Sequence, residues 1–224
     1  MNISNLIILG AGHFGRNALI KCSKSYPHCR ITIVDQNETA LKNCAQEILC
    51  KTVCGDVITY LNSLPKTTSD LQSSWIIPSA PIHVAFEWLK SNHAKPVQKS
   101  EIPNKLLAHL PNAIAGDIGT VYMSYATFRC PDNCPEPIDY CYVTNKPRPI
   151  SLFEALEKLQ FNNFTSIVLQ SRQILPGIGG FQFRDLMTLL ARTESSETPI
   201  LLTTACRCHG VMNAFEFRHA SYSS

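Results

Sequence analysis

The segment LIILGAGHFG, residues 6–15, decides the fold of the amino-terminal half of the chain. Four apolar residues predict a short buried strand, and glycines at positions 10, 12 and 15 follow it with the spacing G-x-G-x-x-G. The next residues, FGRNALIKCSKSY, carry a helical pattern that is broken at Pro27. A strand, a glycine turn and a helix in this order are typical of the first βα unit of a dinucleotide-binding sheet.

Strands and helices continue to alternate after this unit. RITIVD (30–35), KTVCGD (51–56) and SSWIIPS (73–79) predict three further strands, and ETALKNCAQEIL (38–49) predicts a helix between the first two. This alternation favours a Rossmann-like parallel sheet with helices on both faces.

Prolines at positions 96, 103 and 111 interrupt a stretch that has no sustained periodicity. We therefore predict a Rossmann-like domain over 1–95, a linker over 96–118 and a second, smaller α/β domain with Cys-rich loops over 119–224. In this second domain we expect strands at 120–128, 166–170 and 199–205 and helices near 152–160 and 181–193. Ser151 and Glu154 form the S-x-x-E pattern of a capping box at the start of the first of these helices.

The three glycines and Asp35 agree in spacing with a site for NAD. Gly10 permits the tight turn, Gly12 lets the backbone approach a pyrophosphate, and Gly15 lets the helix pack close to the sheet. Asp35 ends the second strand, where its carboxylate can accept hydrogen bonds from a ribose diol and would repel a 2′-phosphate. The alternative is a glycine turn that binds nothing or a different adenosine compound.

Three motifs, ILGAGHFG, IVDQN and CGD, give the first 60 to 90 residues a resemblance to a known family. They resemble the TrkA-N or RCK type of NAD-binding domain found in potassium-uptake regulators, and by this resemblance Asp56 lies near the adenosine. The residues that we predict to bind the cofactor are Gly10, Gly12, His13, Phe14, Gly15, Asp35, Gly55 and Asp56. The Cys-rich half of the chain is assigned to no known family.

One histidine is a candidate catalyst. His83 follows the fourth predicted strand, where such a sheet delivers the nicotinamide end of a dinucleotide, and could exchange a proton during hydride transfer. The alternative is that His83 only faces the first turn of a helix.

Two groups of metal-binding residue types follow predicted strands in the second half. FRCPDNCPEPIDYC carries the first group and CRCHG the second. Together they contain six candidate ligands, namely Cys130, Cys134, Cys141, Cys206, Cys208 and His209. If their strands run parallel, both groups lie at one sheet edge, where they could hold zinc or an iron–sulfur cluster. Thiol–disulfide redox chemistry and ordinary structural thiols are the alternatives.

The segment SRQILPGIGG, residues 171–180, lies between these groups and precedes a predicted helix. Glycine amides at a helix start can hold an anionic group, and a guanidinium adds charge. We interpret it as a candidate anion site formed by Arg172, Gly177, Gly179 and Gly180, or as a plain glycine-rich turn.

The composition excludes several classes of protein. The formal charge is only +3, and the sequence has no run of basic residues that could bind along a phosphate backbone, so we do not expect a nucleic-acid partner. No apolar run approaches the roughly 20 residues of a membrane span, and the amino terminus lacks signal-peptide features. We therefore expect a cytoplasmic protein, whose ten cysteines are thiols, ligands or redox centres rather than structural disulfides. A homodimer is also expected, with a small-molecule or redox-protein partner.

Two hypotheses for function follow. The first is an NAD-dependent oxidoreductase with a Cys/His-ligated metal or iron–sulfur site in its second half. The second is an NAD(H)-responsive regulatory module without catalysis. A tetrapyrrole enzyme is a minor third hypothesis that rests on analogy of parts alone.

Overall fold

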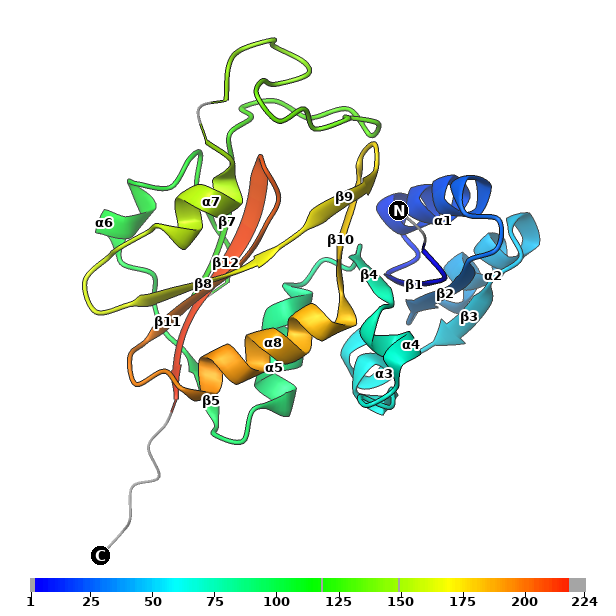
Figure 1. Ribbon diagram of the computed structural model, residues 1–224, viewed down its shortest axis with the longest axis horizontal. Helices are drawn as coiled ribbons and strands as arrows, with labels where there is room; N and C mark the ends of the chain where they lie inside the picture. The colour runs from blue at the N-terminus through cyan, green and yellow to red at the C-terminus, as the bar shows by residue number, and fades with distance from the viewer. Residues whose placement is uncertain (1–2, 118, 149, 218–224) are drawn as a thin grey trace, which may run out of the picture. The chain divides into compact units, whose positions relative to one another are not determined.

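The computed structural model describes residues 3–117, 119–148 and 150–217 of the chain (Figure 1). The chain forms two compact units. The first consists of Met1–Trp88 and Arg172–Met187, and the second of Leu89–Ser171 and Thr188–Ser224. Each unit is built on a mixed six-stranded sheet with helices, so the predicted α/β class is confirmed.

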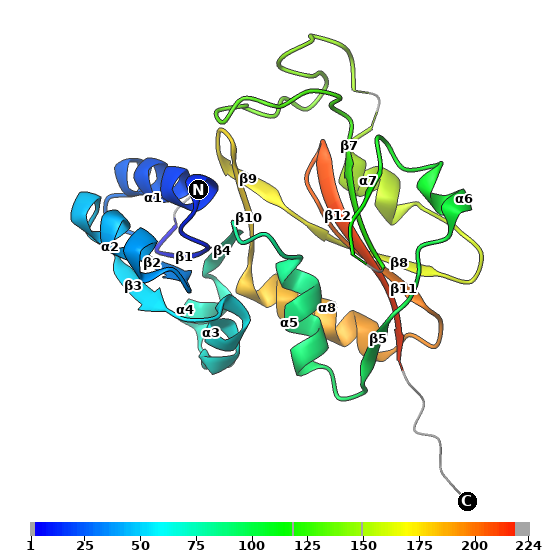
Figure 2. The same cartoon turned by 180° about the vertical axis from the view of Figure 1, so that it is seen from behind.

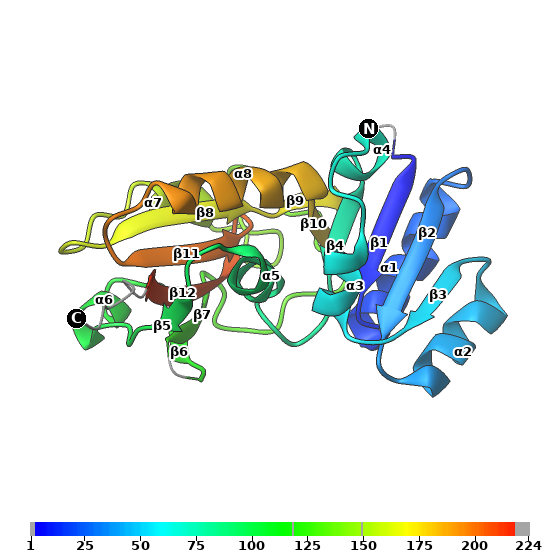
Figure 3. The same ribbon diagram turned by 90° about the horizontal axis from the view of Figure 1, so that it is seen from below.

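The first sheet contains four parallel strands in the order β3-β2-β1-β4, shown side by side in Figure 3. They are β3 (Lys51–Cys54), β2 (Arg30–Asp35), β1 (Asn5–Leu9) and β4 (Trp75–Pro78). Leu9, the last residue of β1, pairs with Val34 on one side and with Pro78 on the other. This order matches the first half of the doubly wound sheet, in which ligands bind beyond the carboxyl ends of the strands.

Helices cover both faces of this sheet. The chain runs outward from β1 through β2 to β3 and then returns to β4 beside β1, and right-handed crossovers in these two directions place their helices on opposite faces. Figure 1 shows α1 and α2 above the strands and α3 and α4 below them. These helices are α1 (His13–Ser25), α2 (Glu38–Glu47), α3 (Val57–Ser63) and α4 (Ser69–Gln72). The apolar faces of α1 and α2 bury Leu19, Cys22 and Leu41 against strand residues such as Ile8 and Ile33.

A β-hairpin from the second half of the sequence completes the first sheet. It consists of β9 (Arg172–Leu175) and β10 (Ile178–Gln182), and β10 lies antiparallel to β4 with Phe181 opposite Ile76. Pro176 and Gly177 connect the strands, and the φ of +76° at Gly177 suits the glycine position of a type II turn. The segment 171–180 is therefore mostly a β-hairpin, and the turn considered for it is confined to Pro176 and Gly177.

The units also differ from the expected domains at residues 96–117. We expected a linker there, but the segment contains β5 (Val97–Lys99), α6 (Asn104–Leu107) and β6 (Ile114–Ala115). Both strands join the second sheet, so the segment belongs to the second unit. Ile118, the last residue of the expected linker, and residues 218–224, the end of the expected second domain, lie outside the described residues.

The second sheet has the order β6-β7-β12-β11-β8, and β5 pairs with β12. Its remaining strands are β7 (Thr120–Ser124), β8 (Thr165–Gln170), β11 (Ile200–Ala205) and β12 (His209–Phe217). β8 runs parallel to β11, and β7 has the same direction because β12 is antiparallel to both β7 and β11. The carboxyl ends of these three strands therefore meet at one edge, so the condition on which the shared edge of the Cys/His loops depended is met.

Helix α7 (Leu152–Glu157) packs on β8 and β11 (Figure 2). The predicted capping box is present, with a Glu154 carboxylate oxygen accepting the Ser151 amide at 3.1 Å. The remaining helices, α5 (Val84–Asn92) and α8 (Phe183–Glu194), each contribute residues to both units. The core of the second unit includes Leu152, Leu156, Val168, Leu201 and Met212.

Candidate functional site

The glycine turn at the end of β1 is determined largely by packing. Gly10 has a φ of +106°, and a β-carbon there would lie 2.9 Å from backbone atoms of Ser79 and Ala80. A β-carbon on Gly15 would lie 1.8 Å from the carbonyl oxygen of Gly10. Both positions exclude any larger residue, because the turn, the helix and the end of β4 approach each other too closely.

Gly12 has no such packing requirement. Its φ is −70°, and no atom lies within 4 Å of the position a β-carbon would take. It is the N-cap of the 13-residue helix α1, with no side-chain cap hydrogen bond and no acidic residue in the first turn. The amino end of α1 therefore faces open space with the positive end of its dipole, an arrangement that favours an anionic group.

Asp35 lies beside this turn at the end of β2. Its Oδ2 accepts the Ala11 amide at 2.6 Å, and its Oδ1 accepts the Asn37 amide at 2.7 Å. Each carboxylate oxygen can accept a second hydrogen bond. The carboxylate thus holds the glycine turn while keeping the capacity to bind hydroxyl groups.

Gly55 and Asp56 follow β3 at the same edge of the sheet. Asp56 is the N-cap of α3. Its Oδ1 accepts hydrogen bonds from the Thr59 amide at 2.8 Å and from the Thr59 hydroxyl at 3.0 Å. The hydrogen bond from the Thr59 amide holds the pKa of this carboxyl below its ordinary value. Gly55 has no atom within 4 Å of a β-carbon position and donates its amide to the Asp35 carbonyl at 2.9 Å.

Two of the histidines of this unit, His13 and His83, occupy different surroundings. His13 packs edge-on against Phe14, whose side chain is 60% exposed at the start of α1. His83 is only 6% exposed and stacks on Phe86 in the first turn of α5. Its position favours a packing role over proton transfer to a substrate.

The residues predicted to form an anion site belong to the β9–β10 hairpin, where they make contacts within the protein. Arg172 Nη1 lies 2.7 Å from Asp185 Oδ2, which also accepts the Gln182 amide at 2.8 Å. Gly179 and Gly180 lie within β10, and a β-carbon on Gly180 would come 2.4 Å from the carbonyl oxygen of Ile76. The structure thus spreads these residues along a β-hairpin and joins Arg172 to a carboxylate.

Three of the candidate ligands, Cys206, Cys208 and His209, lie at the β11–β12 hairpin tip of the second unit. Arg207 and Cys208 are its central residues, and the Cys206 amide donates to the His209 carbonyl at 2.9 Å. The Cys206 sulfur accepts the amides of Cys208 and His209, each at 3.4 Å. These two amide donors favour the thiolate form of Cys206, but burial opposes them more strongly, so its pKa is raised on balance.

The connection between β7 and α7 rises above this hairpin tip in Figures 1 and 2. It brings Cys130 Sγ to 3.6 Å from His209 Nε2, while Cys206 Sγ lies 3.8 Å from His209 Nδ1. The thiols of Cys134 and Cys141 lie close enough to Cys130 to act on its charge, as does Cys130 on Cys208. All six predicted ligands are therefore gathered in one region. Across residues 3–117, 119–148 and 150–217, no three His, Cys, Asp or Glu side chains already stand around a single metal position.

Sequence reasoning missed two charged residues of this cluster. The Glu136 carboxylate accepts the Arg207 amide at 2.8 Å and contacts Cys206, and its own φ is +48°. Arg148 donates Nη2 to the Cys208 sulfur at 3.0 Å and Nη1 to the Ile138 carbonyl at 3.0 Å. No spacing rule identifies either residue, because both are positioned by the irregular connection.

These surroundings set the protonation of the cluster. Burial raises the pKa of Cys208 to about 11, against the opposing effect of Arg148. Burial also raises the pKa of Cys206, and Glu136 adds to this shift. The pKa of His209 is lowered because burial disfavours the imidazolium form. His209 therefore offers neutral ring nitrogens near neutral pH, as a metal ligand must.

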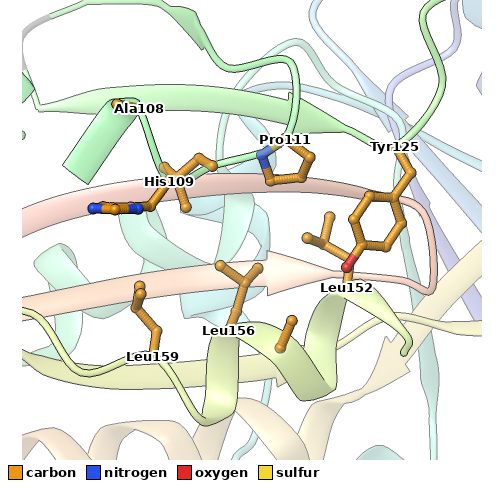
Figure 4. A pocket seen from close by; sticks show the side chains of 9 residues that line it. Ala108, His109, Pro111, Tyr125, Leu152, Leu156 and Leu159 are labelled. Atoms are coloured by element: carbon orange, nitrogen blue, oxygen red, sulfur yellow. The ribbon is translucent and has the colours of Figure 1, made fainter. Parts of the chain in front are cut away.

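A pocket of about 320 Å³ lies next to the cluster (Figure 4). Tyr125 connects the two, because its ring lines the pocket while its amide donates to the Cys208 carbonyl at 2.9 Å. The wall is mainly apolar and includes Leu110, Leu152, Leu156 and Leu159, with His109 as a polar member.

Comparison with known proteins identifies the family. The sequence model of the AF_1314_C family, described as "Uncharacterized protein, C-terminal domain", matches residues 75–218. The chain belongs to the AF_1314_C family. A protein of Archaeoglobus fulgidus (strain ATCC 49558 / DSM 4304 / JCM 9628 / NBRC 100126 / VC-16), described as "Uncharacterized protein", is 30% identical over 227 residues, which cover 94% of this chain and 98% of that protein. No solved structure matches the chain.

In this AF_1314_C member, the matched segment contains all six Cys and His residues of the cluster and the hairpin that completes the first sheet. Ten free cysteines are present, without a disulfide. Of the helices in the described ranges, none has both the length and the apolar character to cross a membrane.

Proposed function

We propose that this AF_1314_C member is an NAD(H)-binding redox protein, an NAD-dependent oxidoreductase whose first unit binds the dinucleotide. The pyrophosphate would lie at the amino end of α1, against the Gly12 backbone. Asp35 would accept hydrogen bonds from the adenosine ribose, and its negative charge would favour NAD(H) over NADP(H). The resemblance of the glycine turn to TrkA-N or RCK domains supports the same ligand.

The observation that carries this proposal is the contrast among the three glycines. Gly10 and Gly15 are required by contacts within the protein, whereas the space beside Gly12 is open. A glycine that the fold itself does not require is explained if a ligand approaches the backbone there. The uncapped amino end of α1 supports an anionic ligand.

The Cys/His cluster would supply the second half of the proposed function. Its six residues have the donor types that hold zinc or an iron–sulfur cluster. A zinc ion acts as a Lewis acid and a cluster transfers single electrons. The free thiols fit a reducing compartment, so we place the protein in the cytoplasm, with a small molecule or a redox protein as partner and a homodimer as its assembly.

The burial of His83 favours a second candidate function, an NAD(H)-responsive regulatory module without catalysis. This function needs nucleotide binding but no proton donor beside the nicotinamide. Oxidation of NADH by an added electron acceptor would support the oxidoreductase. Binding without turnover would support the regulatory module.

The binding proposal is tested by calorimetric titration of the purified chain with NADH and NADPH. We expect Gly12→Ser to weaken NADH binding at least about tenfold, because the new hydroxyl occupies the open space and bonds the helix amides itself. Serine is a favourable N-cap residue, so this variant keeps its stability.

Asp70→Asn is the matched control. Asp70 pairs with Arg30 at the opposite end of β2 from Asp35, so its loss leaves NADH affinity unchanged. Equal NADH affinity of the wild type and Gly12→Ser would contradict the proposed site, and tighter binding of NADPH would contradict the role of Asp35.

A further inference from the structure

The β11–β12 hairpin tip and the connection above it carry a more specific inference about the metal. We propose that the second unit binds one zinc ion through Cys130, Cys141, Cys206 and His209. This inference rests on the metal-binding half of the proposed function and is independent of the nucleotide. It assigns four of the six candidate residues as ligands, with Cys134 as the competing choice to Cys141 for the fourth position and Cys208 held by Arg148.

Cys206 and His209 form the fixed part of the site. They are three residues apart on a two-residue turn, and backbone hydrogen bonds hold that turn on both sides. The Tyr125 amide donates to the Cys208 carbonyl at 2.9 Å, and the Leu152 amide donates to the Arg207 carbonyl at 2.9 Å. The two amides directed at Cys206 Sγ can keep donating to the sulfur when it binds a cation, which would orient it and stabilise its negative charge.

Cys130 approaches this turn from a position 79 residues earlier in the sequence. Its sulfur lies 3.6 Å from His209 Nε2, a separation suited to two ligands of one tetrahedral zinc. Cys206 faces the other ring nitrogen of His209, so a shared ion requires side-chain rotation. Cys130 belongs to the irregular connection between β7 and α7 and is not held within a strand.

Cys141 is assigned as the fourth ligand because it lies on a tight turn and its thiol is close enough to Cys130 to act on its charge. The Thr144 side chain and the amides of Thr144 and Val143 lower the pKa of the Cys141 thiol. The Cys141 amide donates to the Lys146 carbonyl at 2.9 Å, and the Cys141 carbonyl accepts the Asn145 amide at 2.8 Å. A tight turn thus presents a cysteine on each side of the cluster.

The sixth candidate, Cys208, has a different partner. Its sulfur accepts a direct hydrogen bond at 3.0 Å from the Arg148 guanidinium, which a cation would have to displace before it could bind there. Three thiolates and one imidazole complete a tetrahedral set of the Cys₃His type, which is typical of zinc. An iron–sulfur cluster would instead be expected to use four cysteines.

The experiment is metal analysis of the full-length protein purified with zinc chloride present and without nucleotide. We expect about one zinc per chain and no iron. After the zinc is removed by a chelator, titration with cobalt(II) is expected to give the tetrahedral absorption bands together with a strong sulfur-to-cobalt charge-transfer band.

Cys130→Ser, Cys141→Ser and His209→Ala each lose most of the bound zinc, while Cys134→Ser and Cys208→Ser retain about one per chain. Circular dichroism identifies any variant that fails to fold, and the cobalt spectrum of the wild type tests the donor set without any substitution. Iron with sulfide, a chain free of metal, or zinc loss in Cys134→Ser or Cys208→Ser would overturn the assignment. Gly12→Ser is expected to keep its zinc, so failure of the nucleotide proposal leaves this test intact.

Discussion

The carbonyl oxygen of Gly10 occupies the space in which Gly15 would carry a β-carbon, only 1.8 Å from that position. This contact fixes the start of α1 against the end of β1. Two glycines five residues apart therefore determine how closely the first helix packs on the sheet.

Gly15→Ala is expected to destabilise the protein by about 1–3 kcal/mol or more, because the added methyl group collides with rigid backbone. Urea unfolding followed by circular dichroism measures the change. Gly12→Ser is the control, and its unfolding midpoint is expected to stay near that of the wild type. A Gly15→Ala protein as stable as the wild type would show that the turn can relax.

The wild type and Asp56→Asn are expected to differ in stability at acid pH. The folded-state pKa of Asp56 is below the ordinary value, so its cap contributes stability above the unfolded pKa of about 3.9. That contribution is lost as the pH falls through the folded pKa. Asparagine caps a helix equally well and does not titrate. We therefore expect Asp56→Asn to match the wild type at pH 7 and to lose less stability between pH 5 and 2, as measured by thermal unfolding. Equal acid losses in the two proteins would contradict this.

Substitution of Asp185 is expected to lower the free energy of unfolding more than substitution of Arg172. The carboxylate accepts both the Arg172 guanidinium and the Gln182 amide, whereas the 40%-exposed guanidinium side chain remains accessible to solvent. Asp185→Ala leaves an amide without its acceptor and is expected to cost about 1–2 kcal/mol. Arg172→Met is expected to cost less than about 1 kcal/mol. Chemical denaturation of both variants provides the comparison, and a larger loss for Arg172→Met would reverse this ranking.

The buried Cys22 thiol is expected to react with alkylating reagents only when the first unit unfolds. Burial in the core raises its pKa to about 12, so almost no thiolate exists at pH 8. We expect iodoacetamide to leave Cys22 unmodified in the native protein and to alkylate it in urea, as peptide mass spectrometry would show. The exposed Cys54 is the internal control, because it remains accessible in the native state. Native labelling of both residues at the same rate would contradict this prediction.

Local patterns predicted the parts of the fold that depend on neighbouring residues. The glycine turn, the strand at 30–35 and the Ser151–Glu154 capping box follow from spacing within a few positions. The shared edge of the Cys/His loops was only a conditional expectation, because the sequence does not give the directions of β7, β8 and β11. The hairpin at 172–182 was missed because its pairing with Ile76 joins segments about a hundred residues apart, and nothing in Pro176-Gly177 indicates which sheet receives it.

In the cluster, the sequence predicted ligand types but could not predict their neighbours. Glu136 and Arg148 lie on a connection without regular structure, where no periodicity relates a residue to its contacts. The choice among six candidate ligands likewise depends on hydrogen bonds to sulfur, which only the folded backbone defines.

The pairing of β10 with β4 has a consequence for synthesis on the ribosome. The edge of β4 emerges near residue 78, but its partner emerges only after residue 182 has been translated. At about 5–20 residues per second, roughly 5–20 seconds pass between the two events. During this interval the nascent chain displays an unpaired apolar strand that another nascent chain can join. Slow translation between these points is therefore expected to increase co-translational aggregation, whereas the finished chain covers that edge with its own hairpin.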